Sequence, residues 1–376
     1  MKKLLHIEIN PNRIYGLDIL RALAILFVVV QHGSFIMPWK YYKYMNMFTF
    51  DGVSIFFVLS GFLIGGILIK LLENNSISYK LIINFWIRRW FRTLPNYFLI
   101  LFLLLLLGFI FKDDIILIDN KKYIIFSQNL FSEHPKFFPE AWSLSIEEWF
   151  YLLIPVFLFL FIKFFNIEVK NSILISAIGI ILFVTLFRYY RYSVLLIDDI
   201  NSWDLIFRKQ VFTRLDSLMF GVLGAYFNFY CNEFWSKNKR LFLIVGVILF
   251  ILTKFDYLIF NRFGLYHCVF SFSITSLGTL FVLPFLSLLS NGKGFSYKLI
   301  TYISLISYSM YLLNLSVVQL WILSSIDWSY LYDFNGNLFL LIRYILYWFF
   351  TIVISILIYK YFEIPIMNLR DRIKVK

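Results

Sequence analysis

The chain is divided into apolar runs that are each close to the length of a membrane-spanning helix. About 20 mostly apolar residues are needed to cross the hydrocarbon core of a bilayer as a helix. Because lipid offers the backbone no hydrogen bonds, each run must satisfy its own backbone groups, which favours α-helices. The sequence therefore predicts an all-α, polytopic integral membrane protein with about ten transmembrane helices. The ten runs lie near residues 17–36, 48–69, 85–111, 144–165, 172–187, 211–229, 241–258, 268–290, 299–323 and 338–361.

The overall composition excludes a soluble domain. Of the 376 residues, 61% are hydrophobic, and the mean hydropathy is +0.78. A soluble domain of this size could not bury so much apolar side chain. The net charge of +13 does not indicate nucleic acid as a partner, because Lys and Arg in such chains mainly anchor cytoplasmic loops. No polar linker or repeat divides the chain, so residues 1–376 are predicted to form a single transmembrane domain.

The distribution of Lys and Arg predicts the orientation. Ten spans place both termini on the same side of the membrane. With cytoplasmic termini, the inner segments carry about 20 basic residues, whereas the outer loops carry about 12 and most of the acidic loop residues. We therefore expect cytoplasmic termini and a multi-pass protein of the cell's inner (plasma) membrane. The first run is followed by "MPWKYYKY" rather than by a small-residue cleavage site, so it is expected to remain as an uncleaved anchor.

The first run, "LDILRALAILFVVVQHGSF", places three ionisable residues in an apolar helix. Such groups are costly in lipid and commonly mark functional sites. Arg21 and His32 are eleven residues apart, so they share a helix face and lie roughly 16 Å apart along the axis. Asp18 can pair with Arg21, three residues away. The alternative is an inner-leaflet ion pair with a snorkelling arginine and a buried histidine that only packs.

A group of arginines opens the third run, in "NFWIRRWFRTLP". Arg89 and Arg92 are three residues apart and share a helix face with each other. Anchoring on the cytoplasmic side accounts for one or two of the three arginines that begin at Arg88. Arginine also binds phosphate bidentately, so the same group would make a good anion site. The spacing alone leaves both interpretations open.

Two adjacent acidic residues follow the longest outer loop, in "FPEAWSLSIEEWFYLLIP". Ser143 and Ser145 can cap a helix that begins there. Glu147 and Glu148 would then fall in its first turn, where the helix dipole favours carboxylates. Capping accounts for one of the two, and we expect the other to face the interior of the helix bundle.

Further charged residues open the second and sixth runs. Asp51, Arg214 and Asp216 are expected at about the same outer depth as His32 and the Glu147–Glu148 pair. A carboxylate beside an imidazole is the usual arrangement of a general base. The prediction is a divided site, with phosphate-binding arginines towards the cytoplasm and a carboxylate–histidine pair towards the outside. Coenzyme A fits this arrangement, because a pantetheine arm extends from its phosphorylated head.

Several stretches, in order along nearly the whole chain, resemble the membrane acyltransferase-3 family of O-acyltransferases that acetylate cell-surface glycans. No single stretch is diagnostic, but their order is typical of that family. The resemblance implies that Glu147 is the family's acid. The stretches are "GLDILRALAILFVVVQHGS", "GVSIFFVLSGFLIG", "RRWFRTLPNYF", "AWSLSIEEWFYLLIP", "RLDSLMFGVLGAY", "ISYSMYLLNLSV" and the closing Glu363-x-Pro365.

The chain also departs from the family pattern. Asn314 stands where the late motif commonly has a histidine. Ser54 follows Gly52-Val53 where an acidic residue is common, and Asp51 precedes them. No C-terminal SGNH-type hydrolase domain is expected, so transfer would be direct or would use a separate partner.

These observations predict an enzyme that moves an acyl group, acetyl in the simplest case, from acyl-CoA to a hydroxyl of a surface polysaccharide or its lipid-linked precursor. His32 would act as general base or carry the acyl group briefly, and Glu147 would orient it. The partners would be acetyl-CoA as donor, a carbohydrate acceptor and membrane lipid, with no metal and no redox cofactor. Arg21, Arg89 and Arg92 would bind the CoA phosphates, and the acceptor would contact Asp51, Glu148, Arg214 and Asp216.

Two other functions are compatible with parts of the sequence. A transporter or flippase for a lipid-linked glycan also has charges in its spans. Such a protein is expected to contain broken helices in two matched halves, and the sequence shows no such halves. A receptor or scaffold would leave His32 and the arginines without a role. The acceptor, the acyl length and the oligomeric state remain open at this point.

Overall fold

The computed structural model describes residues 9, 13–37, 39–111, 120–329 and 336–370, and these residues form helices and no strand. The predicted all-α fold is confirmed. The longer helices are α2 Tyr15–His32, α4 Gly52–Asn74, α5 Tyr79–Ile110, α7 Ala141–Lys163, α8 Val169–Val194, α10 Leu215–Tyr230, α12 Lys239–Phe255, α13 Ser271–Ser287, α14 Gly294–Leu313 and α16 Gly336–Ile358. The shorter elements include α3 Trp39–Phe48, α6 Lys121–Ile124, α9 Ile200–Trp203, η2 Asp204–Arg208, η3 Val211–Thr213, α11 Asn232–Lys237, η4 Asp256–Leu258, η5 Tyr266–Phe270, η6 Asn314–Leu323, η7 Tyr359–Glu363 and α17 Ile364–Arg370.

The prediction of a polytopic membrane protein is confirmed, with fewer full-length spans than expected. Each of the ten predicted runs is a helix, and eight helices in the described ranges are long and apolar enough to cross a membrane. The other two, α10 and α12, have 16 and 17 residues. At 1.5 Å per residue they extend about 24 and 26 Å, less than the roughly 30 Å hydrocarbon core. The ends of the chain (1–8, 371–376) and the start of the predicted outer loop (112–119) lie outside the described residues.

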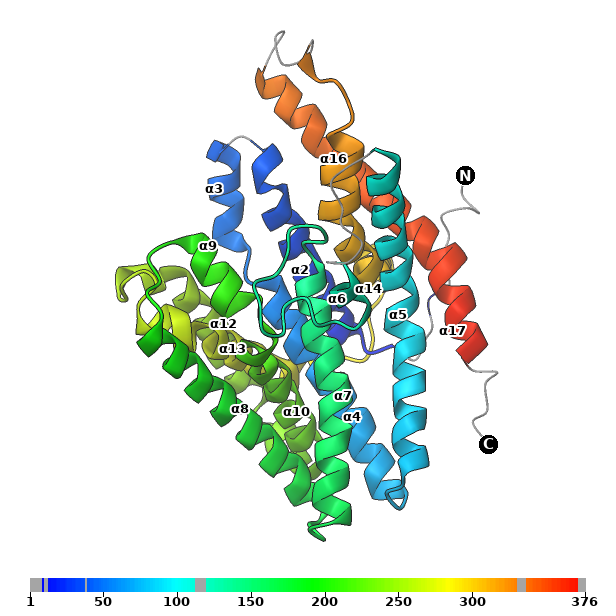
Figure 1. Cartoon of the computed structure of the whole chain (residues 1–376). Coiled ribbons are helices and arrows are strands. Elements are labelled where there is room, and N and C mark those ends of the chain that lie inside the picture. Colours follow the sequence, from blue (N-terminus) through cyan, green and yellow to red (C-terminus); the bar gives the residue numbers. More distant parts are fainter. Residues whose placement is uncertain (1–8, 10–12, 38, 112–119, 330–335, 371–376) are drawn as a thin grey trace.

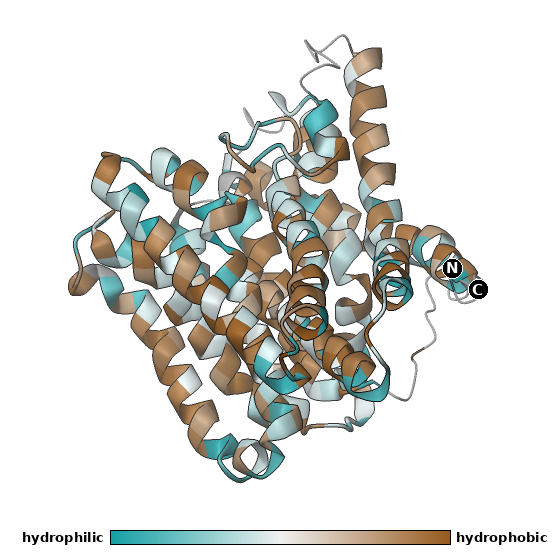
Figure 2. Ribbon diagram, turned by 60° about the horizontal axis from the view of Figure 1, so that its bottom comes forward, coloured by the Kyte–Doolittle hydropathy of each residue, from teal (hydrophilic) through white to brown (hydrophobic). Residues whose placement is uncertain are grey.

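The helices form two groups around a central pair. Helices α8, α12 and α13 lie on one flank, α16 and α17 lie on the other, and α2 and α4 run between them (Figure 1). Most of the length of the helices consists of apolar residues, while polar residues are concentrated in the loops and at helix ends (Figure 2). Large apolar side chains are exposed on the peripheral helices, for example Leu182 and Leu186 on α8 and Phe102 on α5. This surface suits contact with lipid.

The backbones of α4 and α10 approach closely because glycines lie at their contact. A Cβ atom at Gly61 would overlap the carbonyl oxygen of Leu218, and one at Gly221 would overlap the carbonyl oxygen of Val58. Small residues at such contacts let membrane helices approach closely and gain packing energy. The α4–α10 contact therefore depends on the absence of side chains at these two positions.

The beginning of α7 differs from the prediction. Ser143 and Ser145 were expected to cap this helix, but α7 begins at Ala141, after Glu140. Glu147 and Glu148 therefore lie in the second turn rather than the first. Helix capping does not account for either of them, because the dipole effect is confined to the first turn.

Candidate active site

An internal cavity of about 300 Å³ brings together residues that are far apart in the sequence. Five predicted site residues line it, from helices α2, α5 and α7. Serine and tyrosine side chains of α4 and α14 complete much of the polar lining, among them Ser60, Ser304 and Tyr308. The five predicted residues are Arg21, Arg89, Arg92, Glu147 and Glu148.

The three predicted arginines of the cavity have no ion-pair partner among the described residues. Within the described ranges, no carboxylate lies within 4.0 Å of the guanidinium of Arg21, Arg89 or Arg92. Arg89 lies over the ring of Tyr151 at 4.9 Å and hydrogen-bonds its hydroxyl at 3.4 Å. Because unpaired cations are costly in a low-dielectric interior, the cavity is suited to an anionic ligand.

The sequence suggested an ion pair between Asp18 and Arg21, but the structure does not form it. The Asp18 carboxylate accepts a hydrogen bond of 2.9 Å from Nε of Arg13 and one of 2.7 Å from Ser304 Oγ. Arg13 and Asp18 also form an ion pair. The predicted Asp18–Arg21 pair is therefore replaced by an Arg13–Asp18 pair, which leaves Arg21 available to the cavity.

An open groove of about 760 Å³ adjoins the cavity where α4 ends and α5 begins. Arg89, Arg92 and Arg370 line both spaces. Lys80 and Arg88 add positive charge to the groove alone. The groove and the cavity therefore form one basic region that leads from the predicted cytoplasmic side into the bundle.

Both glutamates of α7 face the cavity and are hydrogen-bonded. Glu147 accepts a hydrogen bond from Tyr151 OH and one of 3.2 Å from Ser60 Oγ. Glu148 accepts one of 2.7 Å from Thr93 Oγ1. Through Tyr151, Glu147 is connected to the guanidinium of Arg89.

His32 has a different partner from the one predicted. Its Nδ1 lies 2.6 Å from Oδ1 of Asn314, the residue that replaces the family's histidine. Glu147 bonds Ser60 and Tyr151, so the structure does not form the predicted Glu147–His32 pair. The cavity lining includes Arg21 and Tyr311 but not His32.

Two lining residues of the cavity, Ser143 and Tyr311, are hydrogen-bonded to each other. Ser143 Oγ and Tyr311 OH both line the cavity and lie 2.6 Å apart. Asn314 follows Tyr311 by three residues, a rise of about 4.5 Å along the helix. Asn314, the partner of His32, thus lies about one helical turn from a residue of the cavity lining.

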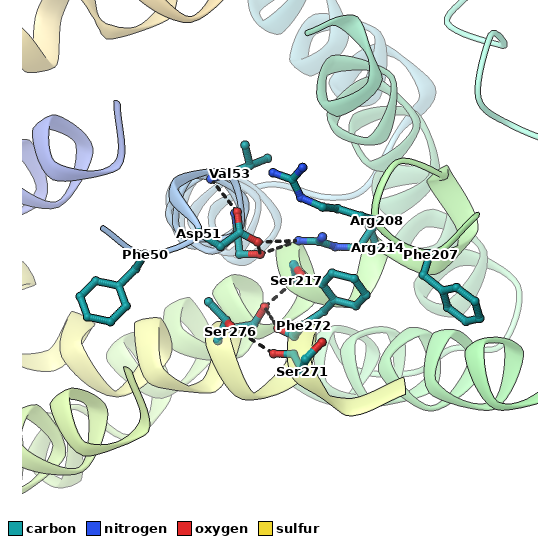
Figure 3. A network of polar contacts seen from close by, with 12 residues as sticks. Phe50, Asp51, Val53, Phe207, Arg208, Arg214, Ser217, Ser271, Phe272 and Ser276 are labelled. Atoms are coloured by element: carbon teal, nitrogen blue, oxygen red, sulfur yellow. Dashed lines mark hydrogen bonds and ion pairs between the residues drawn. The ribbon is translucent and has the colours of Figure 1, made fainter. Parts of the chain in front are cut away.

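Two other predicted acceptor contacts, Asp51 and Arg214, belong to a separate polar network (Figure 3). Asp51 caps α4 by accepting hydrogen bonds from the backbone N–H groups of Val53 and Ser54, and its carboxylate lies 3.8 Å from Arg214. Arg214 also donates to Ser54 Oγ. Asp216 pairs with Arg188 at 2.7 Å, and both side chains are fully buried. The side chains of Asp51, Arg214 and Asp216 do not line the cavity described above.

One charged residue outside the spans, Glu140, connects two elements on the predicted outer side of the helix bundle. Glu140, just before α7, accepts hydrogen bonds from the backbone N–H groups of Leu315 and Ser316 at 3.1 and 2.7 Å. Burial raises the pKa of Glu140 to about 7, although the hydrogen bonds from Ser316 oppose this. Glu140 thereby fixes the start of η6, the element that begins at Asn314.

Three residues of this arrangement were not predicted. Tyr151 lies one helical turn after Glu147, so the i,i+4 spacing in "EEWFY" could have indicated their contact. Arg188 directly follows the fifth apolar run, and within helix α8 a charge calls for a partner. The contacts of Glu140 could not be predicted from the local sequence, because its partners lie 175 and 176 residues further along the chain.

Comparisons with known proteins give a consistent result. Residues 14–360 match the family model described as "Acyltransferase domain", of type 3. The peptidoglycan O-acetyltransferase OatA of Listeria monocytogenes is 34% identical over 180 residues, which cover 44% of this chain and 26% of that protein. A Staphylococcus aureus protein with the provisional name O-acetyltransferase is 29% identical over 327 residues, or 81% of this chain and 50% of that protein. The chain thus spans at most about half the length of these relatives. No solved structure matches it significantly.

Proposed function

The chain belongs to the acyltransferase-3 family and is a membrane acyltransferase, and from this premise we propose that it transfers an acetyl group from cytoplasmic acetyl-CoA to a hydroxyl of a cell-surface polysaccharide or its lipid-linked precursor, in the inner (plasma) membrane. The relatives' names favour acetyl as the acyl group. The name of the Listeria protein makes a peptidoglycan-type wall polymer the first acceptor to test.

The observation that carries the proposal is the set of unpaired arginines in the cavity. Arg21, Arg89 and Arg92 line one cavity and have no ion-pair partners among the described residues. Phosphate groups match guanidinium groups in geometry and charge. The phosphates of coenzyme A would supply the missing negative charge.

The shape of the two joined spaces supports the same donor. The groove is the larger of the two spaces, and the cavity is smaller and less open. The nucleotide end of coenzyme A would occupy the groove beside Arg88 and Arg89, and the pantetheine arm would extend into the cavity. The thioester would then arrive near Tyr311, about one helical turn from Asn314, the partner of His32.

In the proposed reaction His32 is the general base. The acceptor hydroxyl attacks the thioester carbonyl while its proton moves to the imidazole. The new ester C–O bond forms, the C–S bond breaks, and the thiolate of coenzyme A takes the proton back from the imidazole. The protein's part is positioning and proton transfer, because the thioester is already activated.

We assign Glu147 a different role from the one that the sequence suggested. It bonds Tyr151, which in turn contacts Arg89. Glu147 therefore positions the arginine that binds the donor, rather than orienting His32. Glu148, held by Thr93, lies beside it in the same cavity.

A transporter or flippase was the alternative. It accounts for charges inside the bundle, but it gives no reason for a family match and relatives that are named for acetyl transfer. The two functions differ in their product, because only the enzyme leaves an acetyl ester on the glycan.

Mass spectrometry of surface glycans tests the proposed function. A deletion strain is compared with the same strain carrying wild-type protein, His32→Ala or Thr351→Val at equal protein levels. Thr351 is buried on α16, and its hydroxyl has no hydrogen-bond partner in the described part of the chain, so its substitution controls for a buried polar change. We expect acetyl esters with wild type and Thr351→Val and none with His32→Ala. Undiminished acetylation in His32→Ala would exclude the catalytic role.

A further inference from the structure

Element η6 holds the end of α2 at His32 by two separate contacts. His32 is the last residue of α2, and its carbonyl group has no partner within that helix. Gln319 Nε2 donates a 2.7 Å hydrogen bond to this carbonyl oxygen. Asn314, the first residue of η6, holds the imidazole ring of the same histidine. Both the backbone and the side chain of His32 are therefore fixed from one element.

The hydrogen bonds of Asn314 determine which way its amide points. Its Nδ2 lies 2.9 Å from the carbonyl oxygen of Met310 and 2.9 Å from that of Tyr311. A carbonyl oxygen can only accept, so the amide nitrogen must occupy this position. The amide oxygen is then the atom that faces His32.

This orientation defines the protonation of the histidine ring. The amide oxygen of Asn314 has no hydrogen to donate, so Nδ1 of His32 must carry the hydrogen in their 2.6 Å contact. In a neutral imidazole the other nitrogen, Nε2, then holds the free lone pair. Nε2 has no hydrogen-bond partner within the described part of the chain.

A third helix stabilises the same arrangement. Tyr347 of α16 places its hydroxyl 3.0 Å from the carbonyl oxygen of Val29 and 3.1 Å from Oδ1 of Asn314. Both neighbours are acceptors, so the hydroxyl acts as donor and reinforces the amide orientation. Glu140 secures the following backbone at Leu315 and Ser316.

We propose that Asn314 is the positioning residue of His32, which keeps Nδ1 as a hydrogen-bond donor and makes Nε2 the atom that receives the proton of the acceptor hydroxyl. This inference rests on the proposed function for its consequence in the reaction, but the tautomer itself does not. The proton moves from the hydroxyl oxygen to Nε2 and later from Nε2 to the leaving thiolate, while Nδ1–H stays bonded to Asn314. The neutral amide replaces the carboxylate that commonly orients such a histidine.

Nitrogen NMR of the full-length protein in lipid bilayers tests the tautomer directly. The chain has four histidines, so histidine-selective ¹⁵N labelling gives few signals, and the spectrum of His32→Gln identifies the one from His32. We expect the neutral Nδ1–H form in the wild type. Asn314→Leu should give the Nε2–H form or a mixture, whereas Asn314→Asp, which keeps an acceptor, should retain Nδ1–H. An Nε2–H form in the wild type would overturn the inference even if Asn314→Leu fails to fold.

Glycan acetylation separates this inference from the proposed function. At equal protein levels, we expect acetylation to fall about tenfold or more in Asn314→Leu and to be largely restored in Asn314→Asp, with Thr351→Val as the control. If His32→Ala retains full acetylation, the proposed function fails while the tautomer result stands. If His32→Ala abolishes acetylation but the tautomer does not respond to Asn314→Leu, the role of Asn314 alone is refuted.

Discussion

The guanidinium of Arg188 lies 2.7 Å from the carboxylate of Asp216, and neither side chain is reached by solvent. Ser273 Oγ bonds both partners, at 2.8 Å to Arg188 and 2.9 Å to Asp216. The pair connects α8 to α10, and Ser273 extends it to α13. Asp216 was predicted to contact the acceptor, but its position makes it part of the link between these helices.

Breaking this pair from one side is expected to destabilise the protein strongly. Removing one member of a buried ion pair leaves an uncompensated charge and typically costs about 3–5 kcal/mol. Arg188→Leu and Asp216→Ala should each lower the thermal unfolding temperature in detergent by a large amount. The double variant Arg188→Met/Asp216→Leu should regain part of the loss, because no charge remains buried. Equal losses in the single and double variants would contradict a pairing role.

A second prediction concerns the contact between α4 and α10. Gly61→Ala adds a Cβ where the backbone of Leu218 already lies, and such overpacking usually costs about 1–3 kcal/mol. Gly66 lies on the same helix with nothing within 4 Å of a Cβ at that position. We therefore expect a lower unfolding temperature for Gly61→Ala and little change for Gly66→Ala. Similar values for the two variants would show that close backbone contact does not hold these helices together.

A third prediction tests the donor site. Arg89→Lys keeps the charge but loses the forked geometry that binds phosphate bidentately. Calorimetry should show a Kd for coenzyme A that is about tenfold higher, which corresponds to about 1.4 kcal/mol. Lys70→Ala serves as control, because Lys70 is exposed at the same end of α4 and lines neither the cavity nor the groove. An unchanged Kd for Arg89→Lys would remove Arg89 from the donor site.

The sequence predicted the helices well because spanning helices are determined locally. Each apolar run must pair its own backbone groups in lipid, whatever its neighbours are. The five cavity residues were predicted as site residues, but in two halves of a divided site, with Arg21, Arg89 and Arg92 towards the cytoplasm and Glu147 and Glu148 towards the outside. The structure places all five in one cavity.

The partners of the polar residues were less predictable, because they depend on how helices rotate against one another. His32 and Asn314 are 282 residues apart, and no local pattern specifies which faces of α2 and η6 meet. The Glu147–His32 prediction rested on similar depth alone, and depth does not determine direction around the bundle. The Asp18–Arg21 pair was plausible by spacing, but a competitor outside the predicted helix, Arg13, takes the carboxylate.

The last prediction concerns the outer segment between α6 and α7. His134 is buried there, and its Nε2 donates to the carbonyl oxygen of Phe138 at 3.0 Å. Among the described residues its Nδ1 is buried without a hydrogen-bond partner, so a proton added there would bring a charge with no acceptor to bind it. Burial accordingly lowers the pKa of His134 from 6.5 to about 4.

Acidification should therefore loosen this segment. Between pH 6.5 and 4 the unfolded segment binds a proton that the folded segment does not, so stability falls as the pH falls through this window. At pH 5 the loss is about 2 kcal/mol. Hydrogen exchange of residues 120–140, corrected for the intrinsic dependence on pH, should accelerate between pH 7.5 and 5. His134→Gln keeps a donor for Phe138 but does not titrate, so its exchange should change little, whereas His267→Gln should behave as the wild type. Acid-induced exchange that persists in His134→Gln would assign the effect to another group. Glu140 would not account for it. Its pKa is raised to about 7, so Glu140 makes the folded state less stable as the pH rises, not as it falls.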